Sequence, residues 1–165
     1  MAFDSASLYL ASANVNGNVD IERFNSEGLL EPIEGGSSLE RAIPSNEFKK
    51  ELKPLALAFD DARTRLALLH DNEAIVYDLR AWRQMFKVTL SSTTGKRGGV
   101  AFDPSGQLLA VGTQDGWQIW DVAHRKKLCE QAGIGTYAVA FSADGRAFVW
   151  GDLDGHVHIW AARKS

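Results

Sequence analysis

Short apolar runs, separated by polar turns rich in Gly, Asp and Ser, recur along the chain. Each repeat of this pattern contains the same tripeptide, which we use as its marker. The marker is Ala-Phe followed by Asp or Ser, and it occurs at residues 2–4, 58–60, 101–103 and 140–142. Residues 58–78 align with 101–121 without a gap, and residues 2–22 align with 140–160 in the same way. Self-similarity at this period is the signature of a repeat architecture.

Each copy of the unit predicts a small antiparallel meander. A short apolar strand ends at Ala-Phe, and a polar turn such as residues 104–106 (Pro-Ser-Gly) reverses the chain. A second apolar strand leads to an Asp-Gly turn, as at residues 114–116, which is a hairpin signal. A third strand ends at an aromatic residue, and residues 127–131 can form a fourth.

Two stretches, VAFDPSGQLLAVGTQDGWQIWDVAHRKKL and VAFSADGRAFVWGDLDGHVHIW, resemble the WD-repeat family. The likeness covers nearly the whole chain and is weakest at 34–54. The first copy has Glu22 where the family has tryptophan, and the family's Gly-His dipeptide is absent. The resemblance implies a β-propeller, in which four-stranded antiparallel blades surround an axis.

The expected fold is therefore all-β, with about fifteen short strands in four blades. The blades are expected at about residues 1–34, 55–90, 98–132 and 137–161, with an insertion at 35–54 whose second half can form a short helix near 45–52. The last blade is expected to lack its outer strand. Matching inward positions predict that six side chains are buried: Phe59, Phe102, Ile119, Phe141, Val157 and Ile159.

A run of four blades would leave both end blades without a neighbour, and uncapped repeat arrays expose apolar surface. We therefore expect self-association or a partner chain that completes the ring. A closed ring of four blades and a missing part of a longer parent are the alternatives.

Composition narrows the classes of partner. The chain has 165 residues and a formal net charge of −3, which gives no reason to expect a nucleic-acid or membrane partner. Cys129 is the only cysteine, so no disulfide forms within the chain, which fits a cytoplasmic location. The expected partner is another protein.

Candidate chemistry is sparse. Asp154, His156 and His158 alternate along one hairpin, so they share a strand face and could bind Zn²⁺. A polar strand face beside a turn is the favoured interpretation, and we assign no metal, no cofactor and no catalytic residue. Residues 94–99 depart from a phosphate-binding loop, because Arg97 stands where Ser or Thr is required.

The turns at one end of the blades are the expected recognition surface, because loops on a rigid framework carry binding. The candidate partner-binding residues are Phe48, Leu52, His70, Lys96, Arg97, Asp115, Asp154 and His156. The predicted function is a non-enzymatic protein-interaction scaffold. The alternative is a repeat sensor or structural piece of a larger signalling protein or assembly, and a propeller enzyme or small-ligand-binding propeller is less favoured.

Overall fold

The computed structural model describes residues 1–3, 8–13, 19–32, 54–62, 64–90 and 98–161. Within these ranges the chain is all-β, with fifteen strands in four antiparallel sheets and no helix, as the sequence predicts. The expected helix near 45–52 lies outside the described residues, and so does the insertion expected at 35–54 except for Pro54, which begins β5.

Each sheet is a meander whose strands follow chain order, and we call the four sheets blades 1 to 4. Blade 1 contains β1 (Ala2–Phe3), β2 (Tyr9–Ala13), β3 (Val19–Phe24) and β4 (Leu30–Pro32). Blade 2 contains β5 (Pro54–Phe59), β6 (Arg65–His70), β7 (Glu73–Asp78) and β8 (Arg83–Thr89). Blade 3 contains β9 (Val100–Phe102), β10 (Leu108–Thr113), β11 (Gly116–Asp121) and β12 (Lys126–Ala132). Blade 4 contains β13 (Thr136–Phe141), β14 (Ala147–Asp152) and β15 (Val157–Ala161), so among the described residues it has three strands.

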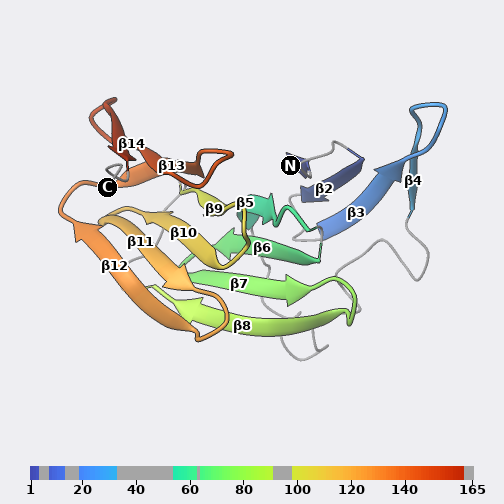
Figure 1. Cartoon of the computed structure of the whole chain (residues 1–165), viewed down its shortest axis with the longest axis horizontal. Helices are drawn as coiled ribbons and strands as arrows, with labels where there is room; N and C mark the ends of the chain where they lie inside the picture. The colour runs from blue at the N-terminus through green and yellow to red at the C-terminus, as the bar shows by residue number, and fades with distance from the viewer. Residues whose placement is uncertain (4–7, 14–18, 33–53, 63, 91–97, 162–165) are drawn as a thin grey trace.

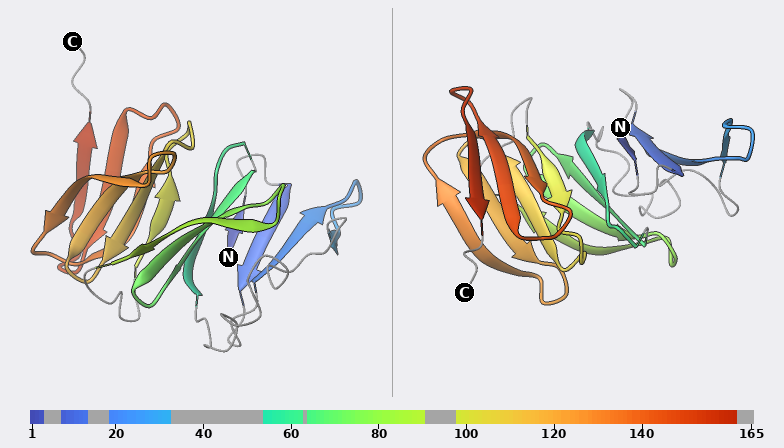
Figure 2. Two further views of the ribbon diagram at one scale, coloured as in Figure 1. Left: turned by 90° about the horizontal axis from the view of Figure 1, so that it is seen from below. Right: turned by 45° about the horizontal axis from the view of Figure 1, so that its top comes forward.

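The blades succeed one another around an open arc. The first strands of neighbouring blades lie side by side, β1 beside β5, β5 beside β9 and β9 beside β13. Blade 1 and blade 4 stand at the two ends of the arc, well separated in both Figure 1 and Figure 2. The described part of the chain is thus a propeller-like arrangement that does not close into a ring.

In blades 2, 3 and 4, the residue that follows Ala-Phe fixes the turn between the first two strands of the blade. In blade 2, Asp60 accepts hydrogen bonds from the backbone N–H groups of Thr64 (2.7 Å) and Arg65 (2.8 Å). Asp103 accepts one from Leu108 (2.6 Å) in blade 3. In blade 4, the Oγ of Ser142 accepts from Ala147 (2.9 Å). The repeated residue therefore has the same role in the three blades, because its side chain accepts backbone hydrogen bonds in the same turn.

Apolar cores lie between neighbouring blades. The core between blades 1 and 2 contains Ala11, Val19, Ile21, Leu57, Leu66, Leu68, Ile75 and Tyr77. The core between blades 2 and 3 contains Ala67, Leu69, Ala74, Val76, Phe86, Val88, Leu90, Val100, Phe102, Leu109, Val111 and Val122. The core between blades 3 and 4 contains Ala110, Trp117, Ile119 and Phe148. Each blade is therefore stabilised by its neighbours, as in other repeat proteins.

The predicted core is partly right. Phe102 and Ile119 are buried. Phe59 is half-buried against the core between blades 1 and 2, and Phe141 is half-buried against the core between blades 3 and 4. The prediction that Val157 and Ile159 are buried is wrong, because their side chains are 72% and 69% exposed. Both lie on the face of blade 4 that points away from blade 3, where no described residue covers them.

Candidate functional site

The hairpin between β14 and β15 is organised around one buried carboxylate. Asp152 is 3% exposed, and its Oδ1 accepts hydrogen bonds from the backbone N–H groups of Asp154 and His156, both at 2.9 Å. Its Oδ2 lies 2.7 Å from Nε2 of His158 and 3.5 Å from Nδ1 of His156. One oxygen therefore shapes the turn, and the other faces two imidazoles.

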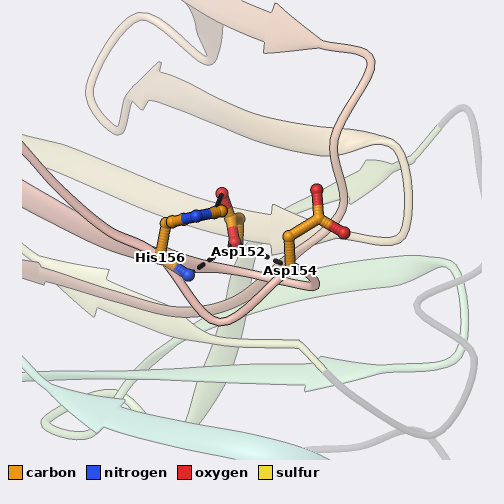
Figure 3. A group of neighbouring side chains, drawn as sticks. All are labelled: Asp152, Asp154 and His156. Carbon is orange, nitrogen blue, oxygen red and sulfur yellow. Dashed lines mark hydrogen bonds and ion pairs between the residues drawn. The ribbon is translucent and has the colours of Figure 1, made fainter.

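Asp154 and His156 complete a cluster with Asp152 at the tip of this hairpin, as Figure 3 shows. One potential ligand atom from each of the three residues lies within 4.8 Å of the others. Asp154 and His156 are exposed, and the ring of His158 stacks on Trp150 with centroids 4.9 Å apart. We call Asp152, Asp154, His156 and His158 the hairpin cluster.

Hydrogen bonding perturbs the titration of Asp152. The bond from His158, followed by the backbone N–H of His156, lowers the pKa of Asp152 from 3.8 to about 2. The carboxylate is therefore ionised at neutral pH, and it has neither a proton to donate nor a tendency to accept one. That suits a structural anchor or a cation ligand and not a general acid or base.

A second feature of blade 4 is the apolar face that points away from blade 3. By strand register, Ile159 corresponds to Ile119 of blade 3, and Val157 corresponds to Trp117. Blade 4 covers the two blade 3 residues, so each is 5% exposed. Their blade 4 counterparts are uncovered, although they have the same apolar character.

The rest of this surface is also apolar. The side chains that share the face with Val157 and Ile159 belong to Ala138, Ala140, Ala147, Val149 and Ala161. We call this set the outer face of blade 4. Large exposed apolar patches on protein surfaces often coincide with interaction sites.

The opposite end of the arc differs in polarity. The face of blade 1 that points away from blade 2 carries Ser12, Asp20 and Glu22 together with the apolar side chains of Phe3, Leu10, Phe24 and Leu30. Asp20 and Glu22 are partly exposed. The two ends of the arc therefore differ: the outer face of blade 4 carries no charged side chain among the residues named, and the outer face of blade 1 is a mixed surface with two carboxylates beside apolar side chains.

The structure brings three of the sequence-predicted partner residues to one end of the blades. The backbone N–H of Gly133 donates to the carbonyl of Asp115 (2.8 Å), and that of Leu153 donates to the carbonyl of Gly135 (2.9 Å). The 133–135 link therefore lies between the turn containing Asp115 and the turn containing Asp154 and His156. All three are exposed.

The other predicted partner residues are placed differently. His70 is largely covered, with Nε2 3.2 Å from Glu73 Oε2, and burial lowers its pKa although Glu73 opposes the shift. Phe48, Leu52, Lys96 and Arg97 lie outside the described residues.

Sequence reasoning missed Asp152, the centre of the hairpin cluster. The period-two pattern of Asp154, His156 and His158 extends back to residue 152, and that extension was the available signal. Thr136 was missed as well. It pairs with Asp152 across the strands, is 1% exposed, and its Oγ1 has no hydrogen-bond partner among the described residues.

Among the described residues, no helix is long and apolar enough to cross a membrane.

Comparisons with known proteins define the fold but no family. No family model matches the chain, and no curated protein matches it. The chain resembles 966 chains of solved structures. The architecture is therefore widespread and does not by itself identify a function. One of them, Kuenenia stuttgartiensis hydrazine synthase, is similar with a TM-score of 0.68 and 13% identity over 97% of this chain. The match spans 44% of that chain, so this sequence covers less than half of its length.

Proposed function

We propose that this chain is a WD-repeat-type propeller arc that acts as a non-enzymatic, cytoplasmic protein-interaction scaffold. The observation that carries the proposal is the outer face of blade 4. Val157 and Ile159 are mostly exposed there, while the corresponding residues of blade 3 are covered by the next blade.

Covering this face with another protein is energetically favourable. Fully burying an aliphatic side chain of this size contributes about 1.5–3 kcal/mol. The alanine and valine side chains around the two residues give the partner a flat, close-packed sheet surface. Sheet faces pack about 10 Å apart, as successive blades do.

The occupant we propose is the same outer face of a second copy of the chain. Head-to-tail closure would bury the outer face of blade 1, where Asp20 and Glu22 lie beside apolar side chains, and burying unpaired carboxylates is costly. A two-fold contact between the fourth blades pairs an apolar surface with itself and leaves the two carboxylates of blade 1 in solvent. The turns at Asp115, Asp154 and His156 then stay free to recognise a further protein.

The central carboxylate of the hairpin cluster suits a structural or binding role and not acid–base catalysis. Its central carboxylate accepts hydrogen bonds at both oxygens and has a pKa of about 2. Acid–base catalysis at neutral pH needs a group that titrates close to that pH.

Sedimentation velocity of the 165-residue chain, at roughly 1–50 µM, tests the proposal. We expect a dimer for the unmodified chain and a monomer for Ile159→Lys, because a charge at the centre of an apolar contact is not compensated. The matched control is Leu29→Lys, which changes another exposed apolar residue (60% exposed) in blade 1, and it should stay dimeric. Circular dichroism checks that both variants keep the strand signal.

A compact monomer at every concentration would contradict the two-fold contact. A dimer that is lost in Leu29→Lys and kept in Ile159→Lys would place the contact at the other end of the arc.

A further inference from the structure

The hairpin cluster offers a donor set that suits a transition-metal ion. It contains the carboxylates of Asp152 and Asp154 and the imidazole of His156, with ligand atoms mutually within 4.8 Å. Imidazole ligands favour Zn²⁺ and related metals over Ca²⁺ and Mg²⁺, which prefer sites made of oxygen atoms alone.

The spacing within the cluster fits this use. Zinc binds imidazole nitrogen and carboxylate oxygen at about 2.0–2.2 Å, so neighbouring ligands in a tetrahedral site are roughly 3.3 Å apart. Nδ1 of His156 lies 3.5 Å from Oδ2 of Asp152. The pair therefore needs almost no movement to share an ion, and the exposed carboxylate of Asp154 can turn toward it (Figure 3).

Hydrogen bonds already hold the central carboxylate in place. Two backbone N–H groups of the turn fix Oδ1 of Asp152, and Nε2 of His158 lies 2.7 Å from Oδ2. Ligating carboxylates in metal sites are commonly oriented by such outer partners. His158 is therefore a positioning residue and not a ligand.

A separate observation concerns a buried hydroxyl on the strand beside the cluster. Thr136 stands directly opposite Asp152 on β13, so both side chains project from the same face of blade 4. Its Oγ1 is buried and has no hydrogen-bond partner among the described residues. Buried polar atoms are seldom left unpaired, and a water molecule held by an ion at Asp152 would supply the partner.

We propose that Asp152, Asp154 and His156 bind one Zn²⁺ ion, with the fourth position taken by water. Three protein ligands and a water form the open zinc arrangement. The ion joins the end of β14 to the start of β15 and so stabilises the blade that presents the outer face. This inference is independent of the proposed dimer.

The test is zinc binding by the chelator-treated 165-residue chain, followed by isothermal titration calorimetry. We expect one Zn²⁺ per chain and a thermal midpoint higher by about 5–10 °C at a zinc concentration 100-fold above Kd. His156→Gln and Asp154→Asn should each weaken binding at least tenfold, and His158→Gln about tenfold. His156 is 71% exposed, so its replacement leaves the fold intact.

The matched control is His124→Gln. His124 also lies beside a carboxylate, with Nδ1 2.9 Å from Oδ2 of Asp121, but it has no third ligand in a described cluster. Its loss should leave zinc affinity unchanged. Replacing zinc with Co²⁺ should give the intense visible absorption of a tetrahedral site in the unmodified chain and not in His156→Gln.

Three results would each overturn the proposal. The first is no zinc uptake at roughly 100 µM. The second is uptake that His156→Gln and Asp154→Asn leave unchanged. The third is Ca²⁺ binding as tight as that of Zn²⁺, which would indicate a carboxylate site of a different class.

Discussion

At the scale of single residues, short polar side chains set the geometry of the turns. Asp60 and Asp103 follow the Ala-Phe marker and bind backbone N–H groups across their turns, and Ser142 does the same in blade 4. Asp152 plays a comparable part at the other end of the blade. The repeat in the sequence is thus a repeat of turn chemistry as much as of apolar strands.

Gly116 is the glycine whose conformation matters most. It has φ +142°, and a Cβ there would overlap the backbone carbonyl of Gln131 on the neighbouring strand. Gly116→Ala should lower the free energy of unfolding by about 2–4 kcal/mol, from backbone strain plus steric overlap. Gly133→Ala is the control, because Gly133 has φ +114° but open space around it, and it should cost about 1 kcal/mol. Urea unfolding measures both, and equal losses would show that the overlap is relieved without cost.

Asp152 should make stability depend on pH in the acid range. Its folded pKa of about 2 lies below the ordinary 3.8, so its contribution is complete above about pH 4 and is lost as the pH falls toward 2. The difference in unfolding free energy between the unmodified chain and Asp152→Asn should therefore shrink over this range. Urea unfolding at several pH values measures it, and a difference that stays constant from pH 5 to pH 2 would contradict the assignment.

At the scale of elements, the sequence predicted the strands well because each is bounded by a turn with its own chemistry. The Asp-Gly pair at residues 115–116 and the Asp-Gly pair at 154–155 both lie in hairpin turns. Burial was predicted less well. Val157 and Ile159 have the pattern of core residues, but whether a sheet face is covered depends on the next sheet in space and not on the pattern itself.

Candidate chemistry was only partly visible from the sequence. Asp154, His156 and His158 were found by their spacing, whereas Asp152 became evident only when the hairpin placed its carboxylate beside the two imidazoles. The position of the buried Thr136 hydroxyl opposite Asp152 depends on the strand register, and no local sequence pattern specifies that register.

The inter-blade cores predict a contrast between two equivalent phenylalanines. Phe102 is 9% exposed in the core between blades 2 and 3, and Phe141 is half-buried between blades 3 and 4. Phe102→Ala should cost about 3–5 kcal/mol, and Phe141→Ala should cost less because less surface is removed from the core. Chemical denaturation measures both, and a loss under about 1 kcal/mol for Phe102→Ala would show that the packing between the blades is wrong.

At the scale of the whole molecule, the arc has two unlike ends. Blade 1 presents Asp20 and Glu22 beside apolar side chains such as Phe3 at its outer face, and blade 4 presents Val157 and Ile159. The same type of sheet face is covered wherever a next blade follows and is uncovered at the C-terminal end of the arc. The proposed scaffold function rests on this asymmetry, because we propose that association occurs through blade 4.

Hydrogen exchange measured at low and at high protein concentration tests this central claim most directly. A contact through the outer face of blade 4 predicts slower exchange for peptides covering 153–161 at high concentration, because association suppresses local opening of β15. Peptides covering 19–32 of blade 1 should exchange at the same rate at both concentrations. Equal exchange of 153–161 at every concentration, or protection confined to 19–32, would contradict the account.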